Sequence, residues 1–461
     1  MKKKYVLILV FSLIIFFLGK NVIILQLNNK NEYISNFKSK IHPNIKSFLK
    51  KTVFRNYALK NELESKNNEI IYLNNELKIL HELNSGKIFF NKTLTSKNEK
   101  NFNLKKYFIP HPKLIYNSPT IKWNYIDDYE DKIVVAISSG KLFFFDKKNL
   151  FTENLNFKIL KSNLHDFVKI SHKKSFADTI KDILIEDKKI YVSFVREVTN
   201  NCYGNAILEA SMNLNEINFD YLFKNDECII DTRTNLYELN PNLNYGQLNQ
   251  SGGRIAKVNN EIFFTIGNYR SWPIAQNKDS IFGKIIRINL ENKKFKTLSM
   301  GHRNAQGLFY LLEKNLLFTS EHGPKGGDEI NLIKLNGTEK IQNFGYPISS
   351  YGDHYDGKYR DEAPLFKSHS KYGFIEPIFY FKEGNIGPSE ILINKNNSLI
   401  LSSLKAQKLY FFKIDDEVNK LNIFNEIDIG ERIRDIIEIN EDSYLLSLEN
   451  TPSIGFLENL N

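Results

Sequence analysis

The chain of 461 residues contains only two cysteines, Cys202 and Cys228, and it lacks any C-x-x-C motif or His/Cys pair with zinc-site spacing. A structural zinc site is therefore not expected. The two cysteines lie 26 residues apart, across what reads as a two-strand excursion. In an oxidising compartment such a pair usually forms a disulfide, and in the cytosol it usually remains as two buried thiols. We favour the disulfide on the condition that the chain is exported.

Two further patterns are missing beyond residue 115. No segment there sustains helical periodicity, and no G-x-G-x-x-G follows a predicted strand, so a dinucleotide-binding domain is not expected. Aromatic residues, by contrast, make up 13% of the chain, with 35 Phe and 23 Tyr. They recur in alternation with Ile and Thr, which is typical of a β-rich protein.

The formal net charge of +10 suggests nucleic-acid binding until it is divided along the chain. Residues 1–113 hold 21 Lys and Arg against 7 Asp and Glu, which leaves 42 against 46 in residues 114–461. The globular part is therefore mildly acidic. A nucleic-acid partner is not expected.

The amino-terminal segment is apolar and follows three lysines. Residues 5–18 are fourteen positions without a charge, and a second apolar stretch covers residues 22–27. Fourteen residues fit a signal-peptide core better than a membrane span, which takes roughly 20. No small-x-small cleavage site follows, so an uncleaved anchor over residues 1–27, with Lys20 near the interface, is more economical. We expect a membrane-anchored protein with its folded domain in the bacterial periplasm or outside the cell.

Residues 28–109 are predicted to form a basic helical stalk and a linker. Leucine and isoleucine recur at alternating steps of three and four along the stalk, with Lys66 breaking the seam. About three heptads predict a marginal coiled coil over residues 57–81. This helix either forms a homo-oligomer, packs on its own domain, or recruits partners to a scaffold. The polar, irregular residues 84–112 read as a linker, so the globular domain is predicted to cover residues 110–461.

One strand pattern recurs six times after residue 115. In each copy a polar turn precedes a β-run, and the runs begin at Ile133, Ile190, Ile262, Leu316, Leu399 and Tyr444. The first and last begin 311 residues apart, and five intervals of about 62 residues suit four-stranded blades with long loops. The sequence therefore predicts an all-β, six-bladed β-propeller, with insertions in the long gaps 190–262 and 316–399. Loops from several blades should meet at the central axis in one ligand site.

The highest density of functional side chains lies in residues 301–347. Two polar clusters, 301–307 and 321–331, bracket the apolar run 308–318. A run of this length predicts a buried strand pair, which places both clusters on loops near one end of a sheet. The glycines of the second cluster allow backbone to approach a ligand closely.

Positive side chains recur at the predicted loop ends. Arg432 and Arg434 lie two residues apart at a strand entry, so their side chains share one face. Without an acid between them, the two guanidinium groups repel unless a multivalent anion is bound. Lys405 and Arg303 are predicted to converge on the same axis, which implies a small polyanionic ligand. The alternative is a set of solvated loop charges paired with acids in residues 430–435.

Three segments together resemble the soluble quinoprotein glucose/sorbosone dehydrogenase family: GHRNAQGL (301–308), EHGPKGGDEINLI (321–333) and NFGYP (343–347). Weaker matches follow the family order, namely SGGRI (251–255), GKIIRIN (283–289), SLK (403–405) and RIR (432–434). The family is a six-bladed propeller that binds pyrroloquinoline quinone, a tricarboxylate, with calcium and oxidises aldose sugars by hydride transfer to the quinone. The resemblance thus implies oxidation of a sugar or related alcohol, with a separate electron acceptor as partner.

The resemblance also assigns roles to individual residues. Those that it places around the cofactor are Arg303, Asn304, His322, Asp328, Lys405, Arg432 and Arg434. It gives the backbone carbonyls of Gly323 and Pro324 as calcium ligands, which suits an ion that prefers oxygen. Calcium would polarise the quinone carbonyl that receives the hydride.

One catalytic position departs from the family pattern. The family has its general base, a histidine, just before the Gly-Gly-Arg turn, and Gln250 occupies that position here. A glutamine amide has no useful basicity. Either His322 or an inserted histidine such as His354 takes the role, or the enzyme is slow or uses another substrate. In the remaining alternative, the propeller binds a carbohydrate or envelope component without catalysis. The family's indole lining also lacks an obvious counterpart, since Trp272 is the only late tryptophan.

Overall fold

The computed structural model describes residue 66 and residues 85–110, 124–138, 140–168, 180–199, 201–231, 245–246, 250–335, 340–382 and 384–460. All of these except Lys66 belong to one compact unit, residues 74–461. The expected anchor at residues 1–27 and nearly all of the helix expected at residues 57–81 lie outside the described residues. Among the residues that are described, no helix combines the length and apolar character that a membrane span requires.

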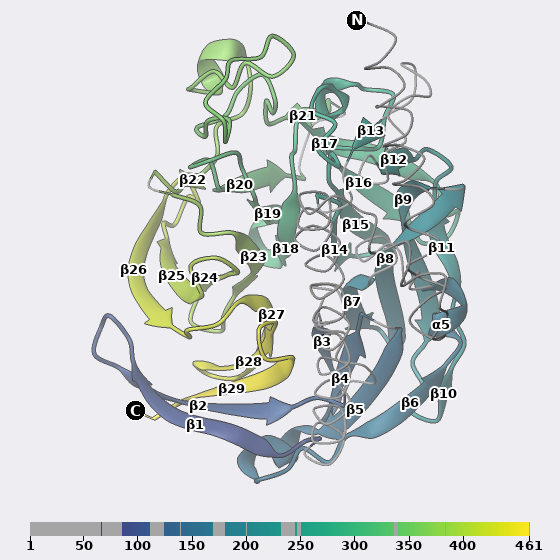
Figure 1. Cartoon of the computed structure of the whole chain (residues 1–461), viewed down its shortest axis with the longest axis vertical. Coiled ribbons are helices and arrows are strands. Elements are labelled where there is room, and N and C mark those ends of the chain that lie inside the picture. Colours follow the sequence, from purple (N-terminus) through teal and green to yellow (C-terminus); the bar gives the residue numbers. More distant parts are fainter. Residues whose placement is uncertain are drawn as a thin grey trace, which may run out of the picture. The chain divides into compact units, whose positions relative to one another are not determined.

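Six mainly antiparallel sheets surround a common axis (Figure 1). The inner strands of the six sheets are β3 (Asn124–Tyr129), β7 (Ile180–Glu186), β14 (Gly252–Val258), β18 (Ala305–Leu311), β23 (Pro388–Ile393) and β27 (Ile433–Asn440). Each inner strand contacts the inner strands of both neighbouring sheets, in this order and back from β27 to β3. The ring is therefore closed, which confirms the predicted six-bladed β-propeller.

The six repeated runs form the second strand of each sheet. These strands are β4 (Lys132–Ile137), β8 (Lys189–Thr199), β15 (Glu261–Ile266), β19 (Leu316–Glu321), β24 (Ser398–Ser403) and β28 (Ser443–Leu448). Each pairs antiparallel with its inner strand. Their side chains are largely buried on both faces because neighbouring sheets pack on either side, which explains their continuous apolar runs.

The remaining strands complete the outer part of each blade. The third strands are β5 (Lys141–Asp146), β9 (Cys202–Ser211), β16 (Lys284–Asn289), β20 (Glu329–Lys334), β25 (Lys408–Ile414) and β29 (Ser453–Asn459). Outside them lie β6 (Lys158–Ser162), β10 (Glu216–Ile217), β11 (Asp220–Lys224), β12 (Ile229–Asp231), β13 (Tyr245–Gly246), β17 (Phe295–Met300), β21 (Gln342–Asn343), β22 (Phe379–Tyr380) and β26 (Leu421–Asp428). The helical elements are α5 (Leu164–Phe167) and the 3-10 turns η3 (Lys147–Phe151), η5 (Pro273–Gln276), η6 (Leu312–Lys314) and η7 (Ser370–Tyr372).

The two ends of the propeller meet in one sheet, and this corrects the predicted linker. β1 (Ile88–Thr95) and β2 (Asn101–Phe108) add to the outside of β29, in the order β1, β2, β29, β28, β27. They run beside the carboxyl-terminal strand in Figure 1. The prediction that residues 84–112 form a linker is therefore wrong for residues 88–108, which hold these two strands. Outer strands expose one side chain in two, so their polar residues concealed a strand pattern in which Phe102 and Leu104 are buried.

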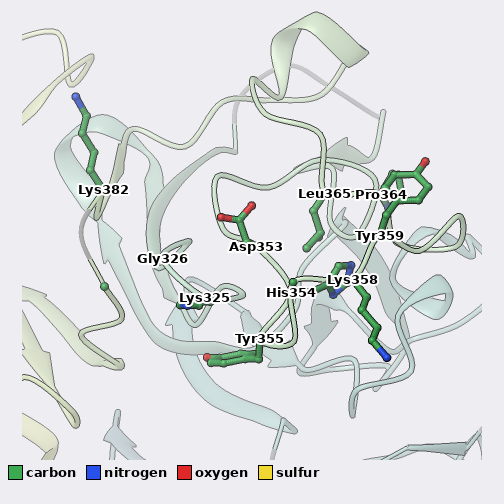
Figure 2. A pocket seen from close by; sticks show the side chains of 12 residues that line it. Lys325, Gly326, Asp353, His354, Tyr355, Lys358, Tyr359, Pro364, Leu365 and Lys382 are labelled. Carbon is green, nitrogen blue, oxygen red and sulfur yellow. The ribbon is translucent and has the colours of Figure 1, made fainter.

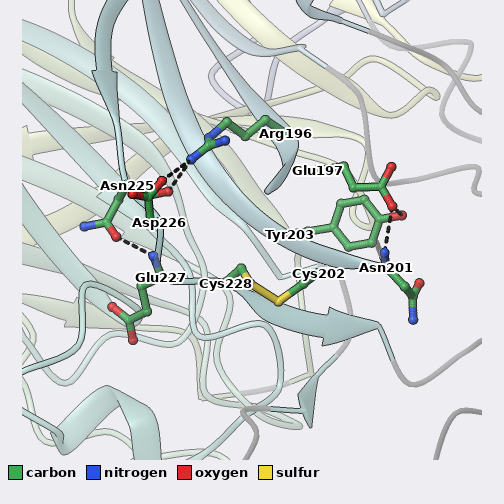
Figure 3. Close-up of a disulfide and its surroundings, with 9 residues drawn as sticks. All are labelled: Arg196, Glu197, Asn201, Cys202, Tyr203, Asn225, Asp226, Glu227 and Cys228. Atoms are coloured by element: carbon green, nitrogen blue, oxygen red, sulfur yellow. Dashed lines mark hydrogen bonds and ion pairs between the residues drawn. A yellow bond between two sulfur atoms is a disulfide. The ribbon is translucent and has the colours of Figure 1, made fainter. Parts of the chain in front are cut away.

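Two long excursions leave the blades where the sequence predicted insertions. The first carries β11 and β12, and a disulfide joins Cys202 at the start of β9 to Cys228 just before β12 (Figure 3). This confirms the disulfide expectation. The second excursion connects β20 to β22, and its residues 344–378 reach the site described below.

Candidate functional site

A pocket of about 220 Å³ lies where loops from four sheets meet. Its lining residues are Gln250, Arg270, Arg303, Asn304, His322, Gly323, Asp328, Tyr355, Asn385, Gly387, Leu404, Lys405 and Arg432. We call it the axial pocket. The structure thus brings together most of the residues singled out from the sequence, including the cations at positions 303, 405 and 432. Two of the residues predicted to form the site are absent from this lining. Pro324 lines an adjoining cavity, and Arg434 lies beside the pocket without lining it.

A buried carboxylate fixes the two polar loops against each other. Glu321, at the end of β19, accepts a hydrogen bond from the backbone N–H of Arg303 and a longer one of 3.3 Å from that of Asn304. Its other oxygen lies 2.9 Å from Nδ1 of His302, which is fully buried. Glu321 therefore positions Arg303 and Asn304. Glu321 begins the EHGPKGGDEINLI motif noted in the sequence, but its role in positioning Arg303 and Asn304 was not predicted.

Asp328 holds the second polar loop in shape. Its carboxylate accepts from the backbone N–H groups of Gly323 (3.0 Å) and Gly387 (2.8 Å) and from Nδ2 of Asn385 (3.2 Å). A side chain at Gly323 is excluded, because its Cβ would lie 1.7 Å from the carbonyl oxygen of Gly327. The loop is therefore built from tightly packed backbone, and Asp328 lines the pocket as a positioning residue.

Arg432 and Arg434 do have an acid between them, which corrects the reasoning from sequence. Glu449, just after β28, accepts from Nε of Arg432 at 2.6 Å and from Arg434 with its other oxygen. Arg434 also donates to Oε1 of Gln306 at 2.9 Å. Glu449 could not be found from local spacing, because it lies more than a dozen residues further along the chain, just past the end of the next strand. Because one carboxylate faces two guanidinium groups, the part of the site formed by Arg432, Arg434 and Glu449 is still positive.

Gln250 lies between two further arginines. Placed by its hydrogen bonds, the amide oxygen accepts from Arg303 Nη2 at 2.7 Å and from Arg270 Nε at 3.2 Å. The amide nitrogen donates to Oδ1 of Asn268 at 3.1 Å. Position 250 is thus surrounded by two cations and a neutral amide. This environment suits an acceptor of hydrogen bonds and stabilises no positive charge there.

His322 is a neutral imidazole in this setting. Burial lowers its pKa to about 4, and the nearby guanidinium groups of Arg303 and Arg434 act in the same direction. The carboxylate of Asp328 opposes this shift without cancelling it. Its Nε2 lies 2.6 Å from the carbonyl oxygen of Pro388, so this nitrogen carries the hydrogen and donates. Nδ1 is then the acceptor. His322 can accept a hydrogen bond at neutral pH, but its basicity is low.

A second cavity of about 350 Å³ adjoins the axial pocket and shares Gln250, Arg270, Arg303 and Tyr355 with it. The excursion between β20 and β22 supplies His354 and Arg360 to its wall. The guanidinium of Arg360 lies 4.8 Å above the ring of Trp272, and the His354 ring lies 5.5 Å from the same indole. The late tryptophan that the sequence singled out therefore does line the site. Nε2 of His354 lies 2.7 Å from the carbonyl oxygen of Ala363.

Deeper on the axis is a charge cluster that the sequence reasoning missed. Nη1 of Arg254, on β14, lies within 3.0 Å of carboxylates on three other inner strands: Asp182 (2.9 Å), Glu390 (2.7 Å) and Asp435 (3.0 Å). All four residues are buried. The three carboxylates are close enough together to hold a metal ion, but Nη1 of Arg254 already lies within 3.0 Å of each of them. The signal was present in the sequence, where β7, β23 and β27 share an acid followed by Ile and a second aliphatic residue.

Comparison with known proteins places the chain in a family. Residues 125–455 match the glucose/sorbosone dehydrogenase family, and the chain belongs to it. The aldose sugar dehydrogenase YliI of Escherichia coli (strain K12) is 28% identical over 247 residues, which cover 49% of this chain and 63% of that protein. Quinoprotein glucose dehydrogenase B of Acinetobacter calcoaceticus is 31% identical over 135 residues, which cover 23% and 27%. The match thus spans less than two thirds of either relative.

Solved structures share the propeller. The apo form of the soluble aldose sugar dehydrogenase from Escherichia coli superposes with a TM-score of 0.59 at 18% identity, covering 77% of this chain and 99% of that one. The PQQ-bound aldose sugar dehydrogenase from Streptomyces coelicolor gives a TM-score of 0.51 at 19% identity, covering 71% and 90%. At these identities the likeness establishes the fold alone.

Proposed function

We propose that the protein is a quinoprotein dehydrogenase that oxidises a sugar or a related alcohol, with pyrroloquinoline quinone bound in the axial pocket. The observation that carries the proposal is the excess of cations there. Arg270, Arg303, Lys405 and Arg432 line the pocket, and its one acidic lining residue is Asp328. A tricarboxylate is the kind of ligand that such a set of side chains neutralises.

The residues present fit the quinone. Arg303 is fixed by its Nη1 bond of 2.8 Å to the carbonyl oxygen of His322, so its position does not depend on a ligand. The ammonium of Lys405 is exposed and forms no ion pair with a described residue, which leaves it available to a carboxylate. Bound quinone would supply the two-electron acceptor for the sugar.

Calcium fits the proposal in part. The carbonyl oxygen of Gly323 accepts no hydrogen bond from a described residue, and oxygen donors of this kind suit the ion. The carbonyl oxygen of Pro324, by contrast, already accepts from Gly327 N at 3.1 Å and from Asn385 Nδ2 at 2.8 Å. An ion at both carbonyls would require the Asn385 amide to turn away.

The proton of the sugar hydroxyl needs an acceptor other than Gln250. His322 and His354 are the two imidazoles that line the axial pocket or the second cavity, and each has one ring nitrogen bonded to a backbone carbonyl. The alternative function is a propeller that holds a carbohydrate or an envelope component without oxidising it. The amide at position 250 favours this alternative, because it removes the base while leaving the cations in place.

We further propose export and tethering through residues 1–27, with the propeller in the periplasm or outside the cell. The Cys202–Cys228 disulfide supports export, because such bonds persist in oxidising compartments. A separate electron acceptor and self-association through residues 57–81 complete the proposed partners.

The test is reconstitution of the full-length protein with pyrroloquinoline quinone and calcium, followed by an aldose-dependent dye-reduction assay. Saturable quinone binding together with dye reduction is the expected result. Quinone binding without dye reduction by any aldose, both in the wild type and in Gln250→His, would favour the binding alternative. Absence of quinone binding would overturn the proposal.

A further inference from the structure

A larger pocket, of about 580 Å³, adjoins the second cavity, and neither the proposed quinone site nor the proposed calcium site uses it. Its walls come from residues 325–326, from residues 353–365 of the β20–β22 excursion, and from Lys382 and Gly384 (Figure 2). We call it the rim pocket. It shares His354 and Tyr355 with the second cavity, and Tyr355 also lines the axial pocket. The three spaces therefore adjoin one another across shared wall residues.

The charge of the rim pocket is positive. Lys325, Lys358 and Lys382 line it, are exposed, and form no ion pair with a described residue. Figure 2 shows Lys358 and Lys382 on opposite sides of Asp353, each extending away from it. Asp353 is the acid among the described lining residues, and its carboxylate is already paired with Lys367 at 2.9 Å. A ligand in this pocket meets uncompensated positive charge, which favours an anion.

The pocket also presents two exposed aromatic rings. Tyr355 and Tyr359 are 67% and 66% exposed, although large apolar side chains are normally withdrawn from water. Exposed rings at the wall of a concave site offer a flat apolar face with a polar edge, which matches the face of a sugar ring. Their exposure is what a stacking surface for a carbohydrate requires.

The wall that carries these groups is held in place rather than loosely attached. Lys325 and Asp353 exchange two backbone hydrogen bonds of 2.9 and 2.8 Å, which tie the excursion to the loop that contains His322 and Gly323. Lys367 also donates to the carbonyl oxygen of Tyr351 at 3.1 Å, and Tyr351 stacks on Tyr380 with ring centroids 3.8 Å apart. The rim pocket therefore keeps a fixed position relative to the axial pocket, which lowers the cost of binding a ligand.

We propose that the rim pocket binds a carboxylated oligosaccharide, with its carboxylates at the three lysines and one end directed through the second cavity toward Gln250. The inference rests on the proposed function in taking a sugar as the ligand. The charge of the ligand follows from the lysines alone. The substrate of the site is then an acidic sugar chain rather than a free neutral aldose.

The first test compares trigalacturonic acid with maltotriose by calorimetry on the full-length protein, with no quinone added. We expect the acidic trisaccharide to bind at least about tenfold more tightly at low salt, with an advantage that shrinks as salt rises. Equal affinities, or no binding of either sugar, would overturn the inference. A separate quinone titration distinguishes this failure from that of the proposed function, because either ligand can bind without the other.

The second test uses a matched set of variants. Removing two lysines in Lys358→Ala/Lys382→Ala should weaken trigalacturonic acid roughly tenfold and leave maltotriose unchanged. Lys371→Ala, an exposed lysine on the same excursion outside the pocket lining, should change neither affinity. Tyr359→Ala should weaken both sugars by removing a stacking face. The inference fails if the double variant binds like the wild type, or if Lys371→Ala weakens binding as much.

Discussion

The middle of the propeller axis and its open end carry opposite excesses of charge. In the middle, the single guanidinium of Arg254 faces three buried carboxylates at 2.7–3.0 Å. At the open end, four cations line the axial pocket together with one acidic residue, Asp328. Both regions collect their charges from several sheets, so the same architecture has produced two different arrangements.

The difference separates a structural from a functional use of charge. The charges in the middle pair with one another, since every carboxylate there has the guanidinium of Arg254 within hydrogen-bond distance. At the open end, Glu449 serves two arginines, and Lys405 forms no ion pair with a described residue although it lines a cavity. A charge excess that the fold leaves uncompensated beside a cavity indicates a ligand of the opposite sign.

Removing Arg254 should break the structural side of this comparison and give the largest effect. Arg254→Met leaves three buried carboxylates without the cation that all of them share, so we expect a loss of roughly 3–5 kcal/mol in the free energy of unfolding. Denaturant titration measures it. Arg432→Met, at a partly exposed pair, should cost within about 1 kcal/mol. Similar losses of unfolding free energy in the two variants would contradict the distinction between structural charges in the middle and functional charges at the open end.

Introducing a base at the open end should change turnover. In Gln250→His/Asn268→Asp, a carboxylate replaces the amide that Gln250 bonds at 3.1 Å, and it should orient the new imidazole and raise its pKa. General-base catalysis is worth on the order of a hundredfold or more, so the quinone-loaded double variant should exceed the wild type by about that factor in dye reduction. Gln250→His alone should gain less, because Arg270 and Arg303 lower the basicity of an unsupported imidazole. If both variants remain at the wild-type rate, proton removal at this position does not limit the reaction.

Removing the exposed cation should weaken cofactor binding without affecting the fold. We expect Lys405→Ala to raise the Kd for the quinone by roughly tenfold, since a charge-assisted contact to a carboxylate is lost. The melting temperature should stay the same, because Lys405 pairs with no described residue. Lys395→Ala, an exposed lysine on the turn between β23 and β24, is the matched control and should leave the Kd unchanged. An unaltered Kd in Lys405→Ala would remove this residue from the site.

The buried acids in the middle should give stability a shallow dependence on pH. Burial raises the pKa of Asp182 to about 7 and that of Glu390 to about 8, so the fold retains protons that the unfolded chain has released. The free energy of unfolding should therefore decrease as pH rises from 6.5 to 8.5, by on the order of 1 kcal/mol. Glu390→Gln, which resembles the protonated acid, should flatten the slope. The lowered pKa of His322 makes the free energy of unfolding increase with pH, but mainly below the ordinary pKa of histidine and so below this range. A slope that is unchanged in Glu390→Gln would contradict the assignment.

The fold was largely predictable because its strongest signal is local. Each second strand is buried on both faces, so β4 or β28 reads as a short apolar run after a polar turn, and six such runs define six blades. β1 and β2 were mistaken for a linker because they are outer strands with polar faces. The pairing of β2 with β29 spans more than three hundred residues of sequence, and no local pattern reports such a contact.

The site was predictable in its cations and less so in their partners. Arg303, Lys405 and Arg432 were located through motifs, and they do share a pocket. The role of Arg254 was missed because its partners lie on other blades, and Glu449 was missed because it lies on the far side of a hairpin from its two arginines. The rim pocket was missed as well, since tyrosines and lysines in an inserted loop resemble ordinary surface until the fold makes them concave.

The central claim, that the open end of the axis receives a small tri-anion, is tested most directly by comparing two ligands of nearly the same shape. The full-length protein would be titrated with pyrroloquinoline quinone and, separately, with its uncharged trimethyl ester. We expect the free acid to bind at least about a hundredfold more tightly, because two or more charge-assisted contacts depend on its carboxylates. Equal affinities for acid and ester, or no binding of the acid, would contradict it.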